Sequence, residues 1–129
     1  MMRAARRAAR LHAVAAKIDK LNTEQLEVAI QERDRPLIVD FFATWCGPCV
    51  LLAKELESVA EELGEAVRVV KVDVDEEQAL ASHLQIQGLP TLVFIGMDKE
   101  KPALRLEGLL PASAIKEVLV DLTSPKVAT

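Results

Sequence analysis

Two observations predict an α/β fold with a central mixed sheet of four to five strands flanked by four helices. Helical and β-type segments alternate through most of the chain, which is typical of parallel strands joined by crossover helices. The last two β-type segments are joined by a short turn, which predicts an antiparallel hairpin. The chain has 129 residues, half of them hydrophobic, and is therefore the size of one domain with a full core.

The first elements lead from a capped helix into a buried strand. Asn22, with Gln25 three residues later, is typical of a helix N-terminus. The segment PLIVDFFA (36–43) is apolar except for Asp40, which predicts a strand covered on both faces. A short additional strand is expected near 15–18.

The remaining elements continue the alternation. Gly64 suits the end of the second helix, because glycine accepts the left-handed backbone conformation found there. The predicted segments are a helix over 48–63, a strand over 66–74, a helix over 76–84, strands over 91–95 and 103–109 joined by a turn at 96–102, and a last helix that opens at Pro111.

Composition excludes several classes of protein. No apolar run approaches the roughly 18 residues of a membrane span. Two cysteines are too few for a disulfide-dense secreted scaffold. Residues 1–18 hold five basic and no acidic residues, whereas the whole chain has 16 Lys and Arg against 20 Asp and Glu, so the body is strongly acidic. Direct binding of nucleic acid is not expected from such a body, because phosphate contacts need basic side chains.

The N-terminus differs in character from the body. Its four arginines are spaced as on one face of a helix, which resembles a remnant of an organelle transit peptide. The alternative is a disordered basic tail. We expect residues 1–13 to lie outside the folded domain, which would span 14–124 and be followed by a short tail at 125–129.

The chemistry is predicted at Cys46 and Cys49, which lie in the sequence WCGPC between the buried strand and the next helix. The unpaired N–H groups at a helix N-terminus stabilise a thiolate and lower its pKa. Cys46 is then the nucleophile that attacks a partner disulfide, and Cys49 resolves the mixed disulfide one helical turn later.

Other uses of two cysteines fit the sequence less well. A structural zinc site needs four ligands, and the two histidines are distant: His12 lies in the tail and His83 in a later helix. A purely structural disulfide that closes so short a loop would stabilise little. No metal or cofactor is therefore expected.

The motif WCGPC resembles the active site of thioredoxins, and the resemblance covers nearly the whole body. The segments VDFFATWCGPC, VVKVDVD, GLPTLVFI and LEGLLP occur in the order and spacing of that family. The resemblance implies the mixed sheet described above and a protein-disulfide reductase. One departure is Val50, where many thioredoxins carry lysine; it makes the rim of the site more apolar.

Asp40 and Lys71 are the expected acid–base pair. The strand around Asp40 is buried, which predicts a raised pKa. In thioredoxins the matching aspartate lies beneath the resolving cysteine and assists its proton transfer, and the matching lysine adjusts the pKa of the aspartate. The alternatives are a structural ion pair between Asp40 and Lys71, and a plain surface role for Lys71.

The resemblance also indicates the substrate-binding surface. It implies that Pro90 is a cis-proline facing the cysteines and that Leu89 offers backbone groups to an extended substrate segment. From the residues alone, Pro90 is a turn proline, because only about 5% of X–Pro bonds are cis. Gly108 resembles a glycine of the same surface, with a β-bulge as the alternative. The other residues expected to contact substrate are Trp45, Gly47, Pro48 and Gly88.

Within the family, FFATWCGPCVLLAKELE, QIQGLPT and LEGLLP resemble the plastid z type most. This resemblance implies the chloroplast stroma, reduction by another thioredoxin or a thioredoxin reductase, and association with the plastid-encoded RNA polymerase through fructokinase-like proteins, without membrane contact. The alternatives are a scaffold subunit of that complex with dispensable cysteines, and a general bacterial or mitochondrial thioredoxin.

Overall fold

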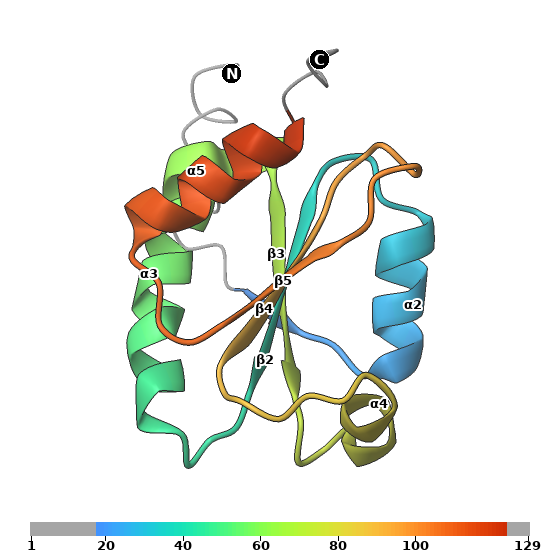
Figure 1. Ribbon diagram of the computed structural model, residues 1–129, viewed down its shortest axis with the longest axis vertical. Helices are drawn as coiled ribbons and strands as arrows, with labels where there is room; N and C mark the ends of the chain where they lie inside the picture. Colours follow the sequence, from blue (N-terminus) through green and yellow to red (C-terminus); the bar gives the residue numbers. More distant parts are fainter. Residues whose placement is uncertain (1–17, 124–129) are drawn as a thin grey trace, which may run out of the picture.

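A computed structural model describes residues 18–123, which form one central sheet with helices on both faces (Figure 1). The predicted tails at 1–13 and 125–129 lie outside the described residues. In chain order the elements are β1 (Asp19–Lys20), α2 (Thr23–Gln31), β2 (Leu37–Phe42), α3 (Gly47–Leu63), the 3-10 turn η1 (Gly64–Ala66), β3 (Arg68–Asp73), α4 (Gln78–His83), β4 (Thr91–Ile95), β5 (Leu104–Glu107) and α5 (Ala112–Thr123).

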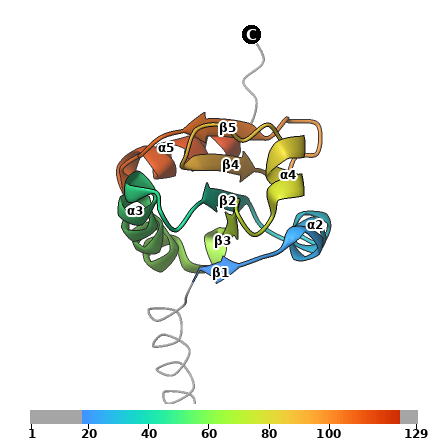
Figure 2. The same cartoon turned by 90° about the horizontal axis from the view of Figure 1, so that it is seen from below.

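The sheet is mixed, as the alternation of segments predicted. The strand order is β1-β3-β2-β4-β5. β1, β3 and β2 are parallel, while β4 is antiparallel to both β2 and β5. Figure 2 shows α3 and α5 covering one face of the sheet and α2 and α4 covering the other. The predicted fold class is confirmed.

The start of α2 confirms the predicted cap in detail. The side chain of Asn22 accepts a hydrogen bond from the backbone N–H of Gln25 at 2.8 Å. The side chain of Gln25 accepts one from the backbone N–H of Asn22 at 2.9 Å. Two donors that the first turn leaves unpaired are satisfied in this way.

The edges of several predicted strands are wrong by a few residues. The first strand lies at Asp19–Lys20, just after the expected 15–18, of which 15–17 are outside the described residues. The last strand ends at Glu107 instead of continuing to 109, because Gly108 has a φ of +98° and leaves the β region.

The core has two layers, one on each face of the sheet. Side chains of α3 and α5 pack with those of alternate strand positions on one face, and α2 packs on the other. The strand β2 is central, and five of its six residues are buried. Phe42 is only half-buried, because it lies at the end of β2 beside the cysteines.

The β2–α3 connection, which carries predicted site residues, lies toward one end of the molecule together with two other connections. In Figure 1 the β2–α3 and β3–α4 connections lie at the lower end, below the segment that leads from α4 to β4. Among residues 18–123, no helix combines the length and the apolar character needed to cross a membrane.

Candidate redox site

The cysteine pair lies where β2 gives way to α3. Cys46 is the N-cap of α3 and has an extended backbone, while Gly47 and Pro48 form the exposed first turn. The sulfur of Cys46 accepts a hydrogen bond from the backbone N–H of Cys49 at 3.2 Å. The two cysteines form a disulfide, with their Cα atoms 5.3 Å apart.

This geometry stabilises negative charge on Cys46. The N–H of Cys49 already points at the Cys46 sulfur, and the positive end of the helix dipole lies at the same place. When the disulfide is reduced, both features favour the thiolate over the thiol. The structure thus places Cys46 at the start of a helix, as the sequence predicted.

Both cysteines are largely covered. The exposed fraction of Cys46 is 6% and that of Cys49 is 3%, so the expected nucleophile, Cys46, is only slightly more exposed than Cys49. Phe42, Val74 and Leu89 pack, from three different segments, against the cluster that the cysteines form with Ala43. Only a small part of either cysteine is therefore exposed.

Trp45 lies on the surface beside the disulfide and is 71% exposed. Its indole N–H donates a hydrogen bond of 2.8 Å to the carboxylate of Asp75, which lies in the β3–α4 connection. That connection is in turn held by Asp73, whose carboxylate accepts from the backbone N–H of Asp75 at 2.8 Å. Sequence reasoning missed Asp75, because no local pattern indicates a contact with a tryptophan 30 residues away in the chain.

Asp40 lies inside the fold on β2. It is 3% exposed, and one of its carboxylate oxygens has no hydrogen-bond partner. Burial raises the pKa of Asp40 to about 7, and the nearby Lys71 ammonium opposes this rise. The direction and cause of this shift are those predicted from the sequence.

Lys71 is directly opposite Asp40 in the parallel β2–β3 ladder. Its Nζ lies 5.5 Å from the centre of the Phe42 ring, so the cation also faces an aromatic surface. Asp40 and Phe42 share one face of β2, and Phe42 contacts the cysteine cluster. The buried carboxyl group thus lies on the α3 side of the sheet, beneath the helix that carries both cysteines.

The loop before β4 closes another side of the site. The Leu89–Pro90 peptide bond is cis, as the resemblance implied. The backbone N–H of Gly108 donates to the carbonyl of Pro90 at 2.8 Å, and the hydroxyl of Thr91 donates to the carbonyl of Gly88. Leu89 packs on the cysteines, so 88–90 and Gly108 form one continuous wall beside the disulfide.

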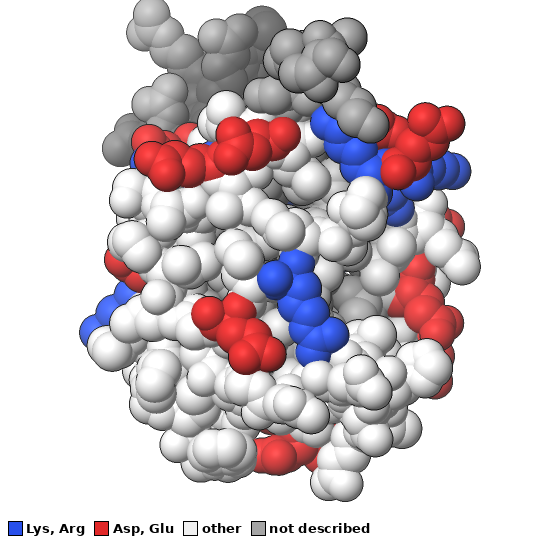
Figure 3. All heavy atoms as spheres, in the orientation of Figure 1, with Lys and Arg blue, Asp and Glu red and all other residues white. Residues whose placement is uncertain are grey.

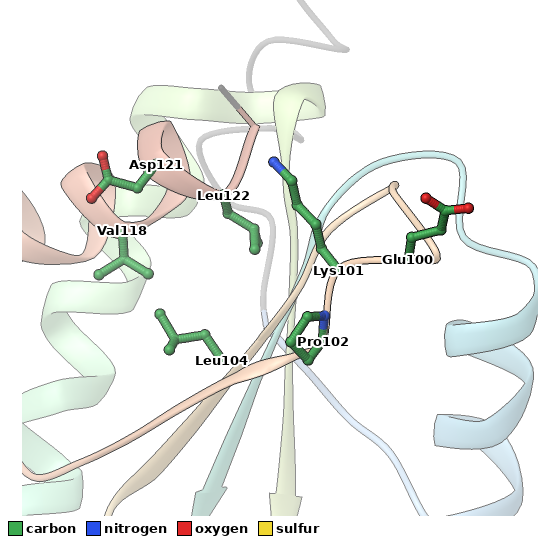
Figure 4. A pocket seen from close by; sticks show the side chains of 7 residues that line it. All are labelled: Glu100, Lys101, Pro102, Leu104, Val118, Asp121 and Leu122. Atoms are coloured by element: carbon green, nitrogen blue, oxygen red, sulfur yellow. The ribbon is translucent and has the colours of Figure 1, made fainter. Parts of the chain in front are cut away.

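A groove of about 440 Å³ lies at the far end of the β4–β5 hairpin (Figure 4). Its apolar side chains are Pro102, Leu104, Val118 and Leu122. Leu104 pairs with Phe94, at the end of the hairpin away from Pro90. The groove is therefore separate from the cysteines. Within residues 18–123, no group of three or more potential ligand side chains is placed to hold a metal ion.

Comparison with known proteins identifies the family. The sequence model described as Thioredoxin matches residues 17–121. The chain is 46% identical over 103 residues to the chloroplastic thioredoxin-like protein CITRX of Solanum tuberosum, covering 79% of this chain and 59% of that protein. It is 48% identical over 103 residues to CITRX of Oryza sativa subsp. indica, covering 79% of this chain and 54% of that protein. The chain thus spans just over half the length of these curated relatives.

Solved structures agree. A chloroplastic thioredoxin z is 61% identical, with a TM-score of 0.80, and the match covers 82% of this chain and 94% of that one. A thioredoxin from Fasciola hepatica is 34% identical, with a TM-score of 0.70, and the match covers 82% of this chain and all of that one. These similarities confirm the resemblance to the plastid z type. With its disulfide at the start of α3 and its buried aspartate, the chain belongs to the thioredoxin family.

Proposed function

We propose that this chain reduces disulfides of partner proteins through Cys46 and Cys49. One observation carries the proposal: the disulfide lies at the N-terminus of α3, where the Cys49 N–H meets the Cys46 sulfur at 3.2 Å. Such a position favours a reactive thiolate and has no evident structural purpose, because the disulfide closes too short a loop to stabilise the fold appreciably.

In the first step the Cys46 thiolate attacks one sulfur of the partner disulfide. The partner's S–S bond breaks, a mixed disulfide forms, and the released partner thiolate takes a proton from solvent. The exposed Trp45 ring and the segment 88–90 flank the attacking sulfur. The backbone groups of Leu89 itself are proposed to pair with an extended partner segment and hold it for attack.

In the second step Cys49 attacks the Cys46 sulfur. Cys49 must first lose its proton, and the Asp40 carboxylate is the base proposed to take it, either directly or through a water molecule. A pKa of about 7 makes Asp40 a far better proton acceptor than an ordinary aspartate. The mixed disulfide then breaks, the partner leaves as a dithiol, and the Cys46–Cys49 disulfide forms. Two electrons have moved to the partner.

The proposed setting is the chloroplast stroma, with another thioredoxin or a thioredoxin reductase as electron donor. The chloroplastic names of the curated relatives and of the thioredoxin z structure support this setting. The finer proposal is contact with the plastid-encoded RNA polymerase through fructokinase-like proteins, as the resemblance to the z type implies. A second role, as a scaffold subunit that does not need its cysteines, follows from the same resemblance.

The two cysteines have different expected phenotypes. Cys46→Ser removes the nucleophile and should abolish reduction of a protein disulfide with dithiothreitol as donor. Cys49→Ser should still attack but should stop at the mixed disulfide, which non-reducing electrophoresis detects. Full activity in Cys46→Ser would contradict the scheme.

Asp40→Asn tests whether the pKa of the buried Asp40 carboxyl group is raised, through the pH dependence of the free energy of unfolding. Because the folded-state pKa is raised from 3.8 to about 7, the folded state binds more protons than the unfolded state between these values. Burial of the Asp40 carboxylate therefore does not lower the free energy of unfolding below about pH 4. Above that pH the loss grows until about pH 7, where it reaches at most about 4 kcal/mol. Urea unfolding of the oxidised protein should show Asp40→Asn stabilised at pH 8 relative to the wild type, and much less so at pH 4.

Asp121→Asn, on the exposed side of α5, is the matched control and should change stability little at either pH. The same Asp40→Asn protein should resolve mixed disulfides more slowly at neutral pH. An unchanged rate of resolution would remove Asp40 from the mechanism even if the stability result holds.

Trapping of mixed disulfides distinguishes partners that react with Cys46 from partners that bind without its thiol. Immobilised Cys49→Ser, incubated with a chloroplast extract, should retain target proteins that dithiothreitol releases, and these should include fructokinase-like proteins. The Cys46→Ser/Cys49→Ser protein is the control, because it cannot form the mixed disulfide. If polymerase subunits co-purify equally with that double variant, the scaffold role is supported; if fructokinase-like proteins appear with neither, the polymerase link is wrong.

A further inference from the structure

The surface around the disulfide exposes apolar side chains. The exposed fractions are 55% for Val50 and 52% for Leu51, both in the first turns of α3, and 46% for Leu109, which follows Gly108. With Trp45 they are here called the apolar rim, defined as Trp45, Val50, Leu51 and Leu109. Such a rim favours a partner whose reactive cysteine lies among apolar side chains.

The segments next to the cysteines in the fold carry acidic residues but no basic residues of their own. The segments that surround the cysteines are 43–52, 73–78, 85–91 and 106–111, and none contains lysine or arginine. Their charged residues are Asp73, Asp75, Glu76, Glu77 and Glu107. Figure 3 agrees: the lowest part of the visible face, where α3 begins in Figure 1, shows uncharged and acidic side chains without basic ones.

Most of these acids already have partners inside the fold. Asp73 caps the β3–α4 connection, and Asp75 accepts from Trp45. Glu76 forms an ion pair with Lys20. Glu77 accepts from the backbone N–H of Thr23 at 2.8 Å. These four carboxylates therefore have contacts within the fold, and Glu107 is the acidic residue of these segments that remains to be assigned a role.

Glu107 lies at the wall of the site. It is opposite Thr91 in the β4–β5 ladder, and Thr91 directly follows the cis-proline Pro90. A Cβ atom added to Gly88 would lie 2.7 Å from Oε2 of Glu107, so the carboxylate rests against the backbone of 88–90. Glycine at position 88 is what allows this approach.

No cation within the described residues neutralises Glu107 through an ion pair. Arg105 is two residues away on the same face of β5 but donates elsewhere. Its guanidinium binds the carbonyls of Leu84 at 2.6 Å and Gln85 at 2.7 Å, at the end of α4. Glu107 is exposed and therefore free to meet a charge brought by a partner.

We propose that Glu107 is a specificity-determining residue of the disulfide site, selecting partners that carry lysine or arginine beside an apolar target cysteine. The proposal rests on the proposed disulfide reductase function and deepens it. The partner segment pairs along 88–90, its apolar side chains cover the apolar rim, and its cation meets the carboxylate against Gly88. The apolar rim then favours partners with apolar side chains through contact area, and Glu107 favours partners with a positive charge.

The expected effect is modest, because an exposed ion pair is weakened by solvent and salt. A preference of roughly two- to fivefold in the second-order rate constant is typical of such a pair. It should shrink as salt rises from about 10 mM to about 300 mM, because screening shortens the reach of the charges. A preference for apolar flanks should not shrink in the same way.

The test uses peptides with one internal disulfide and identical apolar flanks. One series carries lysine, glutamine or glutamate on the N-terminal side of the target cysteine, and a second series carries them on the C-terminal side. Oxidation of the protein is followed by Trp45 fluorescence, because the chain has one tryptophan and no tyrosine. Wild type, Glu107→Gln, Glu107→Lys and Glu100→Gln are compared; Glu100 lies in the β4–β5 turn and gives the same charge change away from the site.

Wild type and Glu100→Gln should reduce the lysine peptide of at least one series several-fold faster than the glutamate peptide at low salt. Glu107→Gln should lose most of that ratio, and Glu107→Lys should reverse it. An unchanged ratio in both Glu107 variants would overturn the proposal. The glutamine peptides report the proposed function separately: if wild type reduces neither of them, the reductase activity itself is contradicted.

Discussion

The proposed chemistry of the whole site depends on one interaction, the hydrogen bond from the Cys49 N–H to the Cys46 sulfur. It exists because a buried strand ends just before a helix begins, so that a side chain at the junction must serve as the cap. A cysteine in that position receives the electrostatic support that a serine or aspartate cap receives elsewhere. The chemistry of the site thus follows from a requirement of every helix, the pairing of its first N–H groups.

Around this junction the fold combines elements that are far apart in the chain. The buried acid comes from β2, its countercharge from β3, the proposed substrate wall from the loop before β4, and Gly108 from the end of β5. The parallel and antiparallel ladders bring them together, because β2 is paired on both sides. Burial then gives Asp40 a pKa near neutrality, where an ordinary aspartate would be a poor proton acceptor.

The sequence was most informative where a local rule governs the structure. The capping pair Asn22 and Gln25, the buried strand interrupted by Asp40, and the cysteines at a helix start all follow from neighbouring residues. The cis form of Pro90 required the family resemblance, since local sequence favours trans. The contacts of Asp75 with Trp45 and of Glu107 with Gly88 were not predictable, because they join segments whose approach depends on the whole sheet. Strand ends were misplaced for a similar reason, as the backbone of Gly108 shows.

The most direct test of the account is the pKa of the Cys46 thiol in the reduced protein. Ultraviolet absorbance of the thiolate, titrated in the Cys49→Ser protein, isolates this one group. The account predicts a pKa clearly below the value of about 8.5 that is usual for a free cysteine, because the start of α3 stabilises the thiolate. A pKa at or above 8.5 would show that the helix N-terminus does not activate Cys46, and the central claim would be wrong.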